Sequence, residues 1–232
     1  MGIIMNAAVI LLGGLFGNKL QKNNSAQNNT TLGIGIIIVS LVSFIENMYR
    51  VEDGKISSSS LILILFAFLI GNKIGESLKI ESWLSSLGKT NNQTFNAFID
   101  TSLFFCVGGL QISGPIALAL NNDNSQLIIK CIIDIPFAII FGATYGKITA
   151  LSSIPVAIIQ IVIAVITHLS AAFFTEEMIA QLCAFGYIIL FFSGLNLATN
   201  NRYKISNISM LPGIFIIILF NILIGAIERI CG

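Results

Sequence analysis

Long apolar runs separated by short polar stretches make up most of the chain. Each run is about 17 to 25 residues long, which is the length of a helix that crosses the hydrocarbon core of a bilayer. The pattern predicts an all-α, polytopic transmembrane helix bundle of about eight spans, with seven as the alternative, forming a single integral membrane domain over residues 1–232. The predicted spans are 2–18, 31–49, 59–78, 95–119, 126–146, 150–173, 177–199 and 208–228.

Composition supports a membrane protein and excludes other classes. Hydrophobic residues make up 55% of the chain and charged residues 10%, with a mean hydropathy of +0.90. A soluble domain has about 25% charged residues, so a soluble globule is excluded. The net charge of +1 gives no basic surface for nucleic acid. We expect a multi-pass protein of the cell membrane, inner or plasma, whose main partner is the lipid bilayer and which needs no cofactor.

The cysteines show no CxxC pair and no metal-ligand spacing, so they are predicted to be reduced packing residues and the sequence assigns no metal. They are Cys106, Cys131, Cys183 and Cys231.

The positive charges that flank the spans predict an orientation. With eight spans, the connections that follow odd-numbered spans carry more lysine and arginine than the others. The first group is Lys19, Lys22, Lys79, Lys89, Lys147, Arg202 and Lys204, and the second is Arg50, Lys55, Lys130 and Arg229. Because cytoplasmic loops are enriched in these residues, both termini are predicted to be extracytoplasmic.

Two connections have a pattern of their own. The segment 21–31, QKNNSAQNNTT, is polar without a periodic apolar face and is predicted to be a loop. In 80–94, apolar residues recur at helical spacing around Trp83, which predicts a short helix lying in the membrane interface.

Glycines spaced four residues apart recur in three odd-numbered spans. Such spacing lets two helix backbones approach closely in lipid, so these glycines are predicted to pack helices together and make a homodimer plausible. Sequence does not separate packing within a chain from packing between chains. The glycines are Gly13, Gly17, Gly71, Gly75, Gly142 and Gly146. In addition, LFGNKL (15–20) returns as LIGNKI (69–74), which suggests an internal repeat of the kind found in transporters.

Four segments resemble a known family. They are MGIIMNAAVILLGGLFGNKL at the start, FNAFIDTSLFFCVGGLQISGPI in the middle, IIDIPFAIIFGATYG in the following span and SGLNLATNNRYKISNISMLPGIFI near the end. The chain resembles the domain-of-unknown-function 554 family of bacterial polytopic membrane proteins over nearly its whole length. Members are described as uncharacterised membrane proteins or candidate transporters, so the resemblance supports the architecture and implies no mechanism.

Asp134, near the middle of the fifth predicted span, is the main candidate for function. A carboxylate at that depth costs about 2.5 to 3.5 kcal/mol even on lenient scales, so it normally faces the bundle interior and has a role or a partner. Pro136 has no N–H to donate to the carbonyl of Ile132, which predicts a kink beside the carboxylate. The alternative is a structural aspartate that is neutral or hydrogen-bonded to a neighbour.

Asp100 and three residues near the cytoplasmic ends of their spans form a second group. Asp100 could pair with Lys73 or Lys19, and Lys73 could also meet Glu76 at i, i+3. Such pairs would act as a structural clamp or as a gate, with the structural role favoured because lysines near helix ends also reach water on their own.

The fourth span is irregular. Gly108, Gly109 and Pro115 weaken a helix and predict either a broken helix at a solute site or a helix over 95–112 followed by a loop. Gln160, at a depth similar to that of Asp134, is a candidate neutral ligand.

The sequence leaves three classes of function. The leading one is a transporter or channel for a cation, a proton-coupled solute or another small polar solute, with Asp134, Gln160 and the break in the fourth span along its path. A cation or proton is favoured because no lysine or arginine is expected at the depth of Asp134. The alternative is a noncatalytic scaffold or lipid-interacting subunit. An intramembrane enzyme is disfavoured, since the chain has one histidine and neither a GxSxG nor an HExxH motif.

Overall fold

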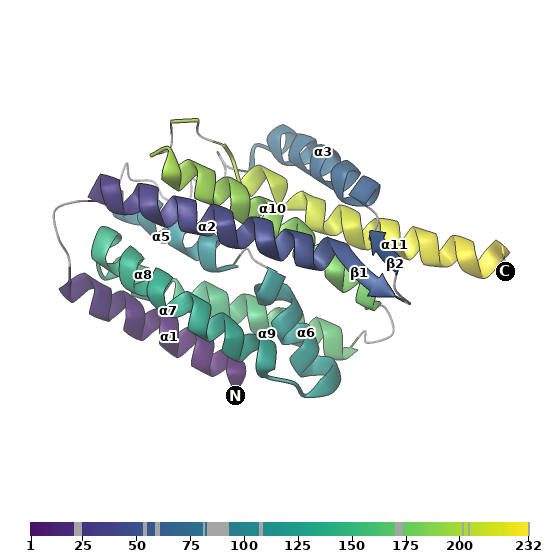
Figure 1. Cartoon of the computed structure of the whole chain (residues 1–232), viewed down its shortest axis with the longest axis horizontal. Helices are drawn as coiled ribbons and strands as arrows, with labels where there is room; N and C mark the ends of the chain where they lie inside the picture. Colours follow the sequence, from purple (N-terminus) through teal and green to yellow (C-terminus); the bar gives the residue numbers. More distant parts are fainter. Residues whose placement is uncertain are drawn as a thin grey trace.

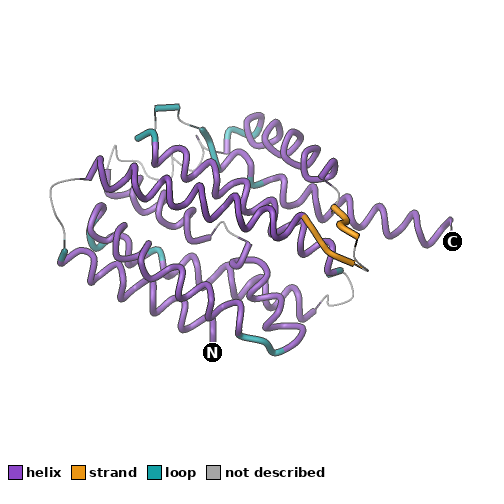
Figure 2. Tube along the Cα trace, in the orientation of Figure 1, coloured by secondary structure: helices purple, strands orange, loops and turns teal. Residues whose placement is uncertain are grey.

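The computed structural model describes residues 1–20, 25–52, 55–58, 61–80, 82, 93–106, 109–169, 174–200, 202, 203 and 205–231. Nearly all of them are helical, which confirms the all-α prediction (Figures 1 and 2). The helices are α1 Gly2–Lys19, α2 Ser25–Met48, α3 Leu61–Ser77, α5 Gln93–Cys106, α6 Gly109–Asn121, α7 Ser125–Tyr145, α8 Ile148–Leu151, α9 Ser153–Leu169, α10 Glu176–Ala198, the 3-10 helix η2 Ile208–Met210 and α11 Pro212–Cys231. Two strands, β1 Tyr49–Glu52 and β2 Lys55–Ser58, form a hairpin.

Six helical segments of the described chain are long and apolar enough to cross a membrane. They are Gly2–Lys19, Thr30–Met48, Ser125–Tyr145, Ile148–Leu169, Glu176–Ala198 and Ile208–Ile227. The pair α5 and α6 makes a seventh if it counts as one span, with a bend of 48° between its halves. The predicted span 59–78 corresponds to α3, an apolar helix of 17 residues that lies beside α11 (Figure 1).

Successive long helices run in opposite directions, so that α1 begins and α11 ends on the same side of the bundle, although the two termini lie well apart in this view (Figure 1). We call this side the termini end; the hairpin β1–β2 and residues 122–124 also lie there. The opposite end carries the C-terminal end of α1 and the turn between α7 and α8 (Figure 1). The C-terminal ends of α1, α3, α7 and α10 therefore lie toward the opposite end, and which end faces the cytoplasm stays a prediction.

Three close helix pairs organise the bundle, and each joins an early helix to a late one: α1 with α7, α2 with α10, and α3 with α11. Most of the side chains of α10 are buried, whereas α1, α2, α3, α9 and α11 expose many leucine, isoleucine and phenylalanine side chains. In a bilayer these exposed apolar faces would meet lipid, and α10 is the central helix.

The start of α7 is fixed by polar contacts at the termini end. Asp123 accepts hydrogen bonds from the backbone N–H and the hydroxyl of Ser125, both at 2.8 Å, and these bonds lower the pKa of the Asp123 carboxyl. Asn124 Oδ1 accepts from the backbone N–H of Gly2 at 2.9 Å. The bond from Gly2 to Asn124 helps to set the register of α1 against α7, the two helices that carry Asn6 and Asp134.

The connections differ from the predictions in two places. The loop predicted at 21–31 is wrong for its second half, because α2 already begins at Ser25; extending an existing helix costs far less than nucleating one, so polar residues can continue it beyond the apolar run. The hairpin was not predicted either. Its register pairs Val51 with Ile56, and the intervening Asp53 and Gly54 are a sequence that favours two-residue hairpin turns.

The fourth predicted span does not form a helix over 95–112 followed by a loop, which was one of its two predicted structures. Residues 113–120 are helical, because α6 runs from Gly109 to Asn121 with Pro115 inside it. The bend lies between α5 and α6, so Gly108 and the break itself fall outside the described residues. The interfacial helix predicted around Trp83 lies outside them too.

Candidate functional site

A buried ion pair lies within the membrane-crossing part of α7. Lys130 Nζ is 2.8 Å from Asp134 Oδ2, one helical turn apart, and the exposed fractions of the two residues are 6% and 4%. At 1.5 Å of rise per residue, Asp134 lies about 14 Å along α7 from its start, close to the middle of a hydrocarbon core of about 30 Å. The ion pair is therefore at membrane depth.

Amide side chains from three other helices extend this ion pair into a network. Asn6 Nδ2 on α1 donates to Asp134 Oδ2 at 2.7 Å. Gln160 Nε2 on α9 donates to Asn6 Oδ1 at 3.0 Å and to Gln111 Oε1 on α6 at 2.9 Å. All three amides are fully buried, so the polar network joins four helices in the centre of the bundle.

Two backbone carbonyls complete the network. Lys130 Nζ donates to the carbonyl of Phe105 on α5 at 3.2 Å, and Gln111 Nε2 donates to the carbonyl of Val156 on α9 at 3.2 Å. Lys130 thus contacts the C-terminal end of α5, immediately before the bend between α5 and α6. Among the described residues, the buried Gln160 Oε1 has no hydrogen-bond partner.

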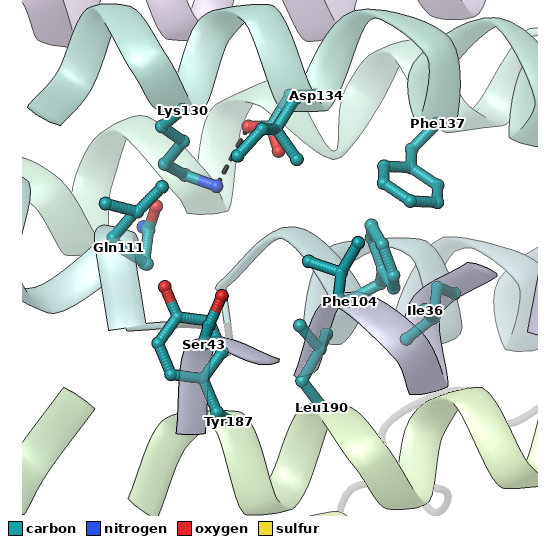
Figure 3. A pocket seen from close by; sticks show the side chains of 12 residues that line it. Ile36, Ser43, Phe104, Gln111, Lys130, Asp134, Phe137, Tyr187 and Leu190 are labelled. Carbon is teal, nitrogen blue, oxygen red and sulfur yellow. Dashed lines mark ion pairs between the residues drawn. The ribbon is translucent and has the colours of Figure 1, made fainter. Parts of the chain in front are cut away.

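The ion pair faces a small cavity of about 50 Å³ (Figure 3). Polar groups from Gln111, Lys130 and Asp134 line one side, and Tyr187 and Ser43 present hydroxyl groups from α10 and α2. The remaining walls are apolar. They are formed by Ile36, Val39, Phe104, Leu110, Ile133, Phe137 and Leu190. A water molecule needs roughly 10–15 Å³ of such space, so the cavity can hold about three to five.

A larger groove of about 570 Å³ lies between this cavity and the termini end. We call it the vestibule; its polar lining includes Asn47, Ser113, Asn121, Gln126 and Glu176. The buried Gln126 Oε1 has no hydrogen-bond partner within the part of the chain that the structure describes. Leu110 and Tyr187 line both the vestibule and the cavity. The cavity and the vestibule therefore adjoin at these two side chains.

Aromatic side chains close the other side of the cavity. Phe104 and Phe137 line it with ring centroids 5.0 Å apart. Phe104 also contacts Phe141 at 4.9 Å, and Phe141 stacks on Tyr145 at 5.9 Å. Because Phe137, Phe141 and Tyr145 follow one another along α7, this aromatic column leads from the cavity to the opposite end.

Sequence reasoning had selected two members of this network, Asp134 and Gln160, and the structure joins them through Asn6. Pro136 lies inside α7, which runs without a break from Ser125 to Tyr145. Gly109 begins α6 at the bend.

The other predicted charged residues lie elsewhere. Lys19, Lys73 and Glu76 are exposed, and Glu76 Oε1 accepts from Asn72 Nδ2 at 2.9 Å. The Asp100 side chain lies outside the described part of α5, so its pairing with Lys19 or Lys73 stays a prediction.

The predicted glycines pack helices within the chain. A Cβ on Gly17 would collide with the carbonyl oxygen of Ile139, and one on Gly142 with that of Gly14, where α1 meets α7. Gly13 faces Ala138 in the same contact, Gly71 faces Gly213 of α11, and Gly75 faces Ser209 of η2. Gly146 has another role, since it ends α7 with φ 82°, a conformation that favours glycine.

Three residues of the site were missed or misplaced by sequence reasoning. Lys130 was assigned to the membrane surface as a flanking charge, and neither Asn6 nor Gln111 was selected as a candidate. The i, i+4 spacing of Lys130 and Asp134 was the available signal. The premise that no lysine lies at the depth of Asp134 is wrong.

The described residues contain no cluster of three or more histidine, cysteine, aspartate or glutamate side chains suited to a metal ion. The arrangement offers an ammonium group, a carboxylate and buried amides around a small cavity. Charged and amide groups of these kinds can form hydrogen bonds to a small polar molecule.

Comparisons with known proteins agree on the family. Residues 1–222 match the family described as protein of unknown function (DUF554), as the sequence resemblance predicted. The chain is 26% identical to the uncharacterized protein YqgA of Escherichia coli (strain K12) over 237 residues, and 23% identical to the uncharacterized membrane protein YdfK of Bacillus subtilis (strain 168) over 219 residues, with 93% of each chain covered in both cases. No solved structure matches.

Proposed function

The chain belongs to the DUF554 family, and we propose that it carries a small polar solute across the membrane through a binding site at the Lys130–Asp134 ion pair. The Asp134 carboxylate and the Lys130 ammonium group bind the solute, and Gln111, Tyr187 and Ser43 surround it. The proposal extends the sequence-based hypothesis of a transporter or channel.

The observation that carries the proposal is a buried ion pair at membrane depth that opens onto a cavity. Ionisable groups at this depth are costly and usually mark solute or ion paths. A buried ion pair adds little net stability, because desolvation of both charges offsets their attraction. The order of the charges, lysine before the acidic residue, is also the less favourable one along a helix. A purely stabilising role therefore explains the ion pair poorly.

The surroundings of the cavity support one-sided access. The vestibule leads from the termini end to Leu110 and Tyr187, whereas the aromatic column fills the path to the opposite end. A transporter exposes its central site to the two sides alternately by moving one group of helices against another. This arrangement corresponds to a state that faces the termini end with the site nearly closed.

Lys130 changes the preferred solute. A bare cation that entered the cavity would meet an ammonium group as well as a carboxylate, and the two charges already compensate each other. A polar solute that offers a partner to each of them suits the site better than a simple cation does.

The alternative function is a noncatalytic scaffold or lipid-interacting subunit. The hydrogen bonds of Asn6, Gln111 and Gln160 favour it, since such bonds can simply hold helices together. The glycine contacts are used inside the chain, so they no longer supply an argument for the homodimer. The site does not support the hypothesis of an intramembrane enzyme, because the described residues place no second carboxylate beside Asp134.

Uptake into proteoliposomes tests transport against the scaffold. The solutes are four radiolabelled molecules of the same size: glycine as zwitterion, glycinamide as cation, glycolate as anion and glycolamide as neutral molecule. The control is Lys130→Met/Asp134→Asn, which removes both charges and keeps an acceptor for Asn6. A transporter takes up at least one solute faster than this control does. Equal uptake of all four by both proteins contradicts the proposal.

A further inference from the structure

We infer that the solute is a small zwitterion of about the size of glycine or alanine, with its ammonium group on Asp134 and its carboxylate on Lys130. This inference rests on the proposed function and names the chemical class of the solute. It follows from the hydrogen-bonding capacity that the ion pair leaves unused toward the cavity.

Asp134 has an acceptor to spare. Both of its hydrogen bonds, from Lys130 Nζ and from Asn6 Nδ2, end on Oδ2. Within the described part of the chain Oδ1 has no partner, and Asp134 lines the cavity. A carboxylate oxygen accepts strong, charge-assisted hydrogen bonds, so a solute ammonium group is its best partner.

Lys130 has a donor to spare. Its ammonium group carries three N–H donors; one points to Asp134 Oδ2 and one to the Phe105 carbonyl. The third has no acceptor among the described residues, and Lys130 lines the same cavity. A solute carboxylate would accept this hydrogen bond and compensate the lysine charge while the solute ammonium group engages Asp134.

Charge balance favours a zwitterion over an ion of either sign. The Lys130–Asp134 pair is neutral as a whole, so a solute with one charge would leave a net charge buried at membrane depth, which is costly. A zwitterion leaves the sum at zero and offers each protein charge an opposite one. The two charges of an α-amino acid are also adjacent, as Lys130 Nζ and Asp134 Oδ2 are at 2.8 Å.

The size of the cavity limits the side chain of the solute. About 50 Å³ holds roughly three to five water-sized groups, which corresponds to the non-hydrogen atoms of glycine. Val39, Ile133 and Leu190 form apolar walls that would accept a methyl group. Larger amino acids would require the cavity to expand.

Binding to the purified protein tests this inference without requiring transport. The probes are glycine, L-alanine, glycinamide, glycolate and glycolamide, and the readout is the midpoint of thermal unfolding as each concentration rises. A ligand that binds the folded state raises this midpoint. We expect glycine and L-alanine to raise it at concentrations at least about tenfold lower than the other three, since each singly charged analogue loses a charge-assisted hydrogen bond.

Two variants and a control locate the binding. Val39→Phe fills the cavity and leaves both charges in place, so it should abolish the glycine effect in a folded protein. Lys130→Met/Asp134→Asn should abolish it as well. Asn221→Ala removes another interhelical bond, from Asn221 Nδ2 to Gln181 Oε1 at 2.7 Å, in residues that do not line the cavity, and should keep the glycine effect.

The outcomes separate this inference from the proposed function. If glycinamide, glycolate or glycolamide binds as well as glycine, or if glycine and L-alanine do not shift the midpoint, the zwitterion assignment is wrong, whatever the uptake assay shows. If glycine binds but the wild-type protein takes up none of the four solutes faster than the Lys130→Met/Asp134→Asn control, the assignment of a zwitterionic ligand is supported and the proposed transport is contradicted.

Discussion

Lys130 Nζ lies 2.8 Å from Asp134 Oδ2 on the same helix, and both side chains are buried at membrane depth. This relationship explains how a chain of this class keeps an ionised aspartate in its interior. Lys130 supplies the counter-charge and Asn6 supplies a hydrogen bond, and both side chains are buried in the bundle. The ion pair is neutral as a whole, and both of its groups keep unused hydrogen-bonding capacity toward the cavity.

Removing one member of the ion pair should destabilise the protein more than removing both. Asp134→Asn leaves the Lys130 ammonium group buried without a counter-charge, which costs about 3–5 kcal/mol. Lys130→Met/Asp134→Asn leaves no charge and should recover most of that loss. Chemical unfolding in detergent micelles measures the three proteins. An Asp134→Asn protein as stable as the wild type would show that the ion pair is not formed.

Close contact between α1 and α7 should depend on Gly17. A Cβ at this position meets the carbonyl oxygen of Ile139, so Gly17→Ala should lower the free energy of unfolding by about 1–3 kcal/mol. Gly35 is the matched control, because a Cβ there meets nothing within 4 Å. Gly35→Ala should leave stability unchanged or raise it by about 0.5–1 kcal/mol. Equal effects of the two substitutions would contradict the helix pairing.

Asn196 should hold the segment that follows α10. Its Nδ2 donates to the carbonyl of Ile205 at 2.6 Å, and its Oδ1 accepts from the Ile205 N–H at 3.0 Å. Asn196→Ala removes both bonds, so the Ile205 amide should exchange its hydrogen on the order of tenfold faster or more. Asn72→Ala, which removes an exposed bond to Glu76, should not change exchange at Ile205. Unchanged exchange in Asn196→Ala would show that other contacts fix this segment.

Both termini should lie outside the cytoplasm. In the structure α1 begins and α11 ends on the same side of the bundle. Lys19 at the end of α1 and Lys147 between α7 and α8 lie toward the other side, where the positive-inside rule predicts the cytoplasm. Alkaline phosphatase fused after residue 232 should be active, and green fluorescent protein fused there should be dark. Fluorescence of the second fusion, with an inactive phosphatase, would reverse the orientation.

Apolar runs were enough to predict the helices, because each span must satisfy its own backbone and present apolar residues to lipid. The apolar runs were not enough to predict whether a charged residue near the end of a helix lies at the surface or inside the bundle. Lys130 lies five residues into α7, a place where a lysine can either reach the surface or turn inward, and only the positions of Asp134 and the Phe105 carbonyl decide between them. Sequence therefore misassigned Lys130 while finding Asp134.

Neutral polar residues were harder to rank. Gln111 and Gln160 are both fully buried glutamines in apolar helices, and sequence alone gave no reason to join them to each other or to Asn6. The helix pairing that brings α1 beside α7 and α9 beside α6 is long-range packing. It determines the site, and no local pattern encodes it.

Thiol labelling at Ser43 tests most directly whether the ion pair lies on a path through the membrane. Ser43 lines the cavity, and Ser43→Cys is nearly isosteric; Cys106, Cys131, Cys183 and Cys231 are replaced by serine in the same protein. A membrane-impermeant methanethiosulfonate is applied to right-side-out and to inside-out vesicles. A transporter with alternating access predicts labelling from both sides. A cysteine at position 43 that reacts from neither side, in a folded protein, would contradict transport through this site.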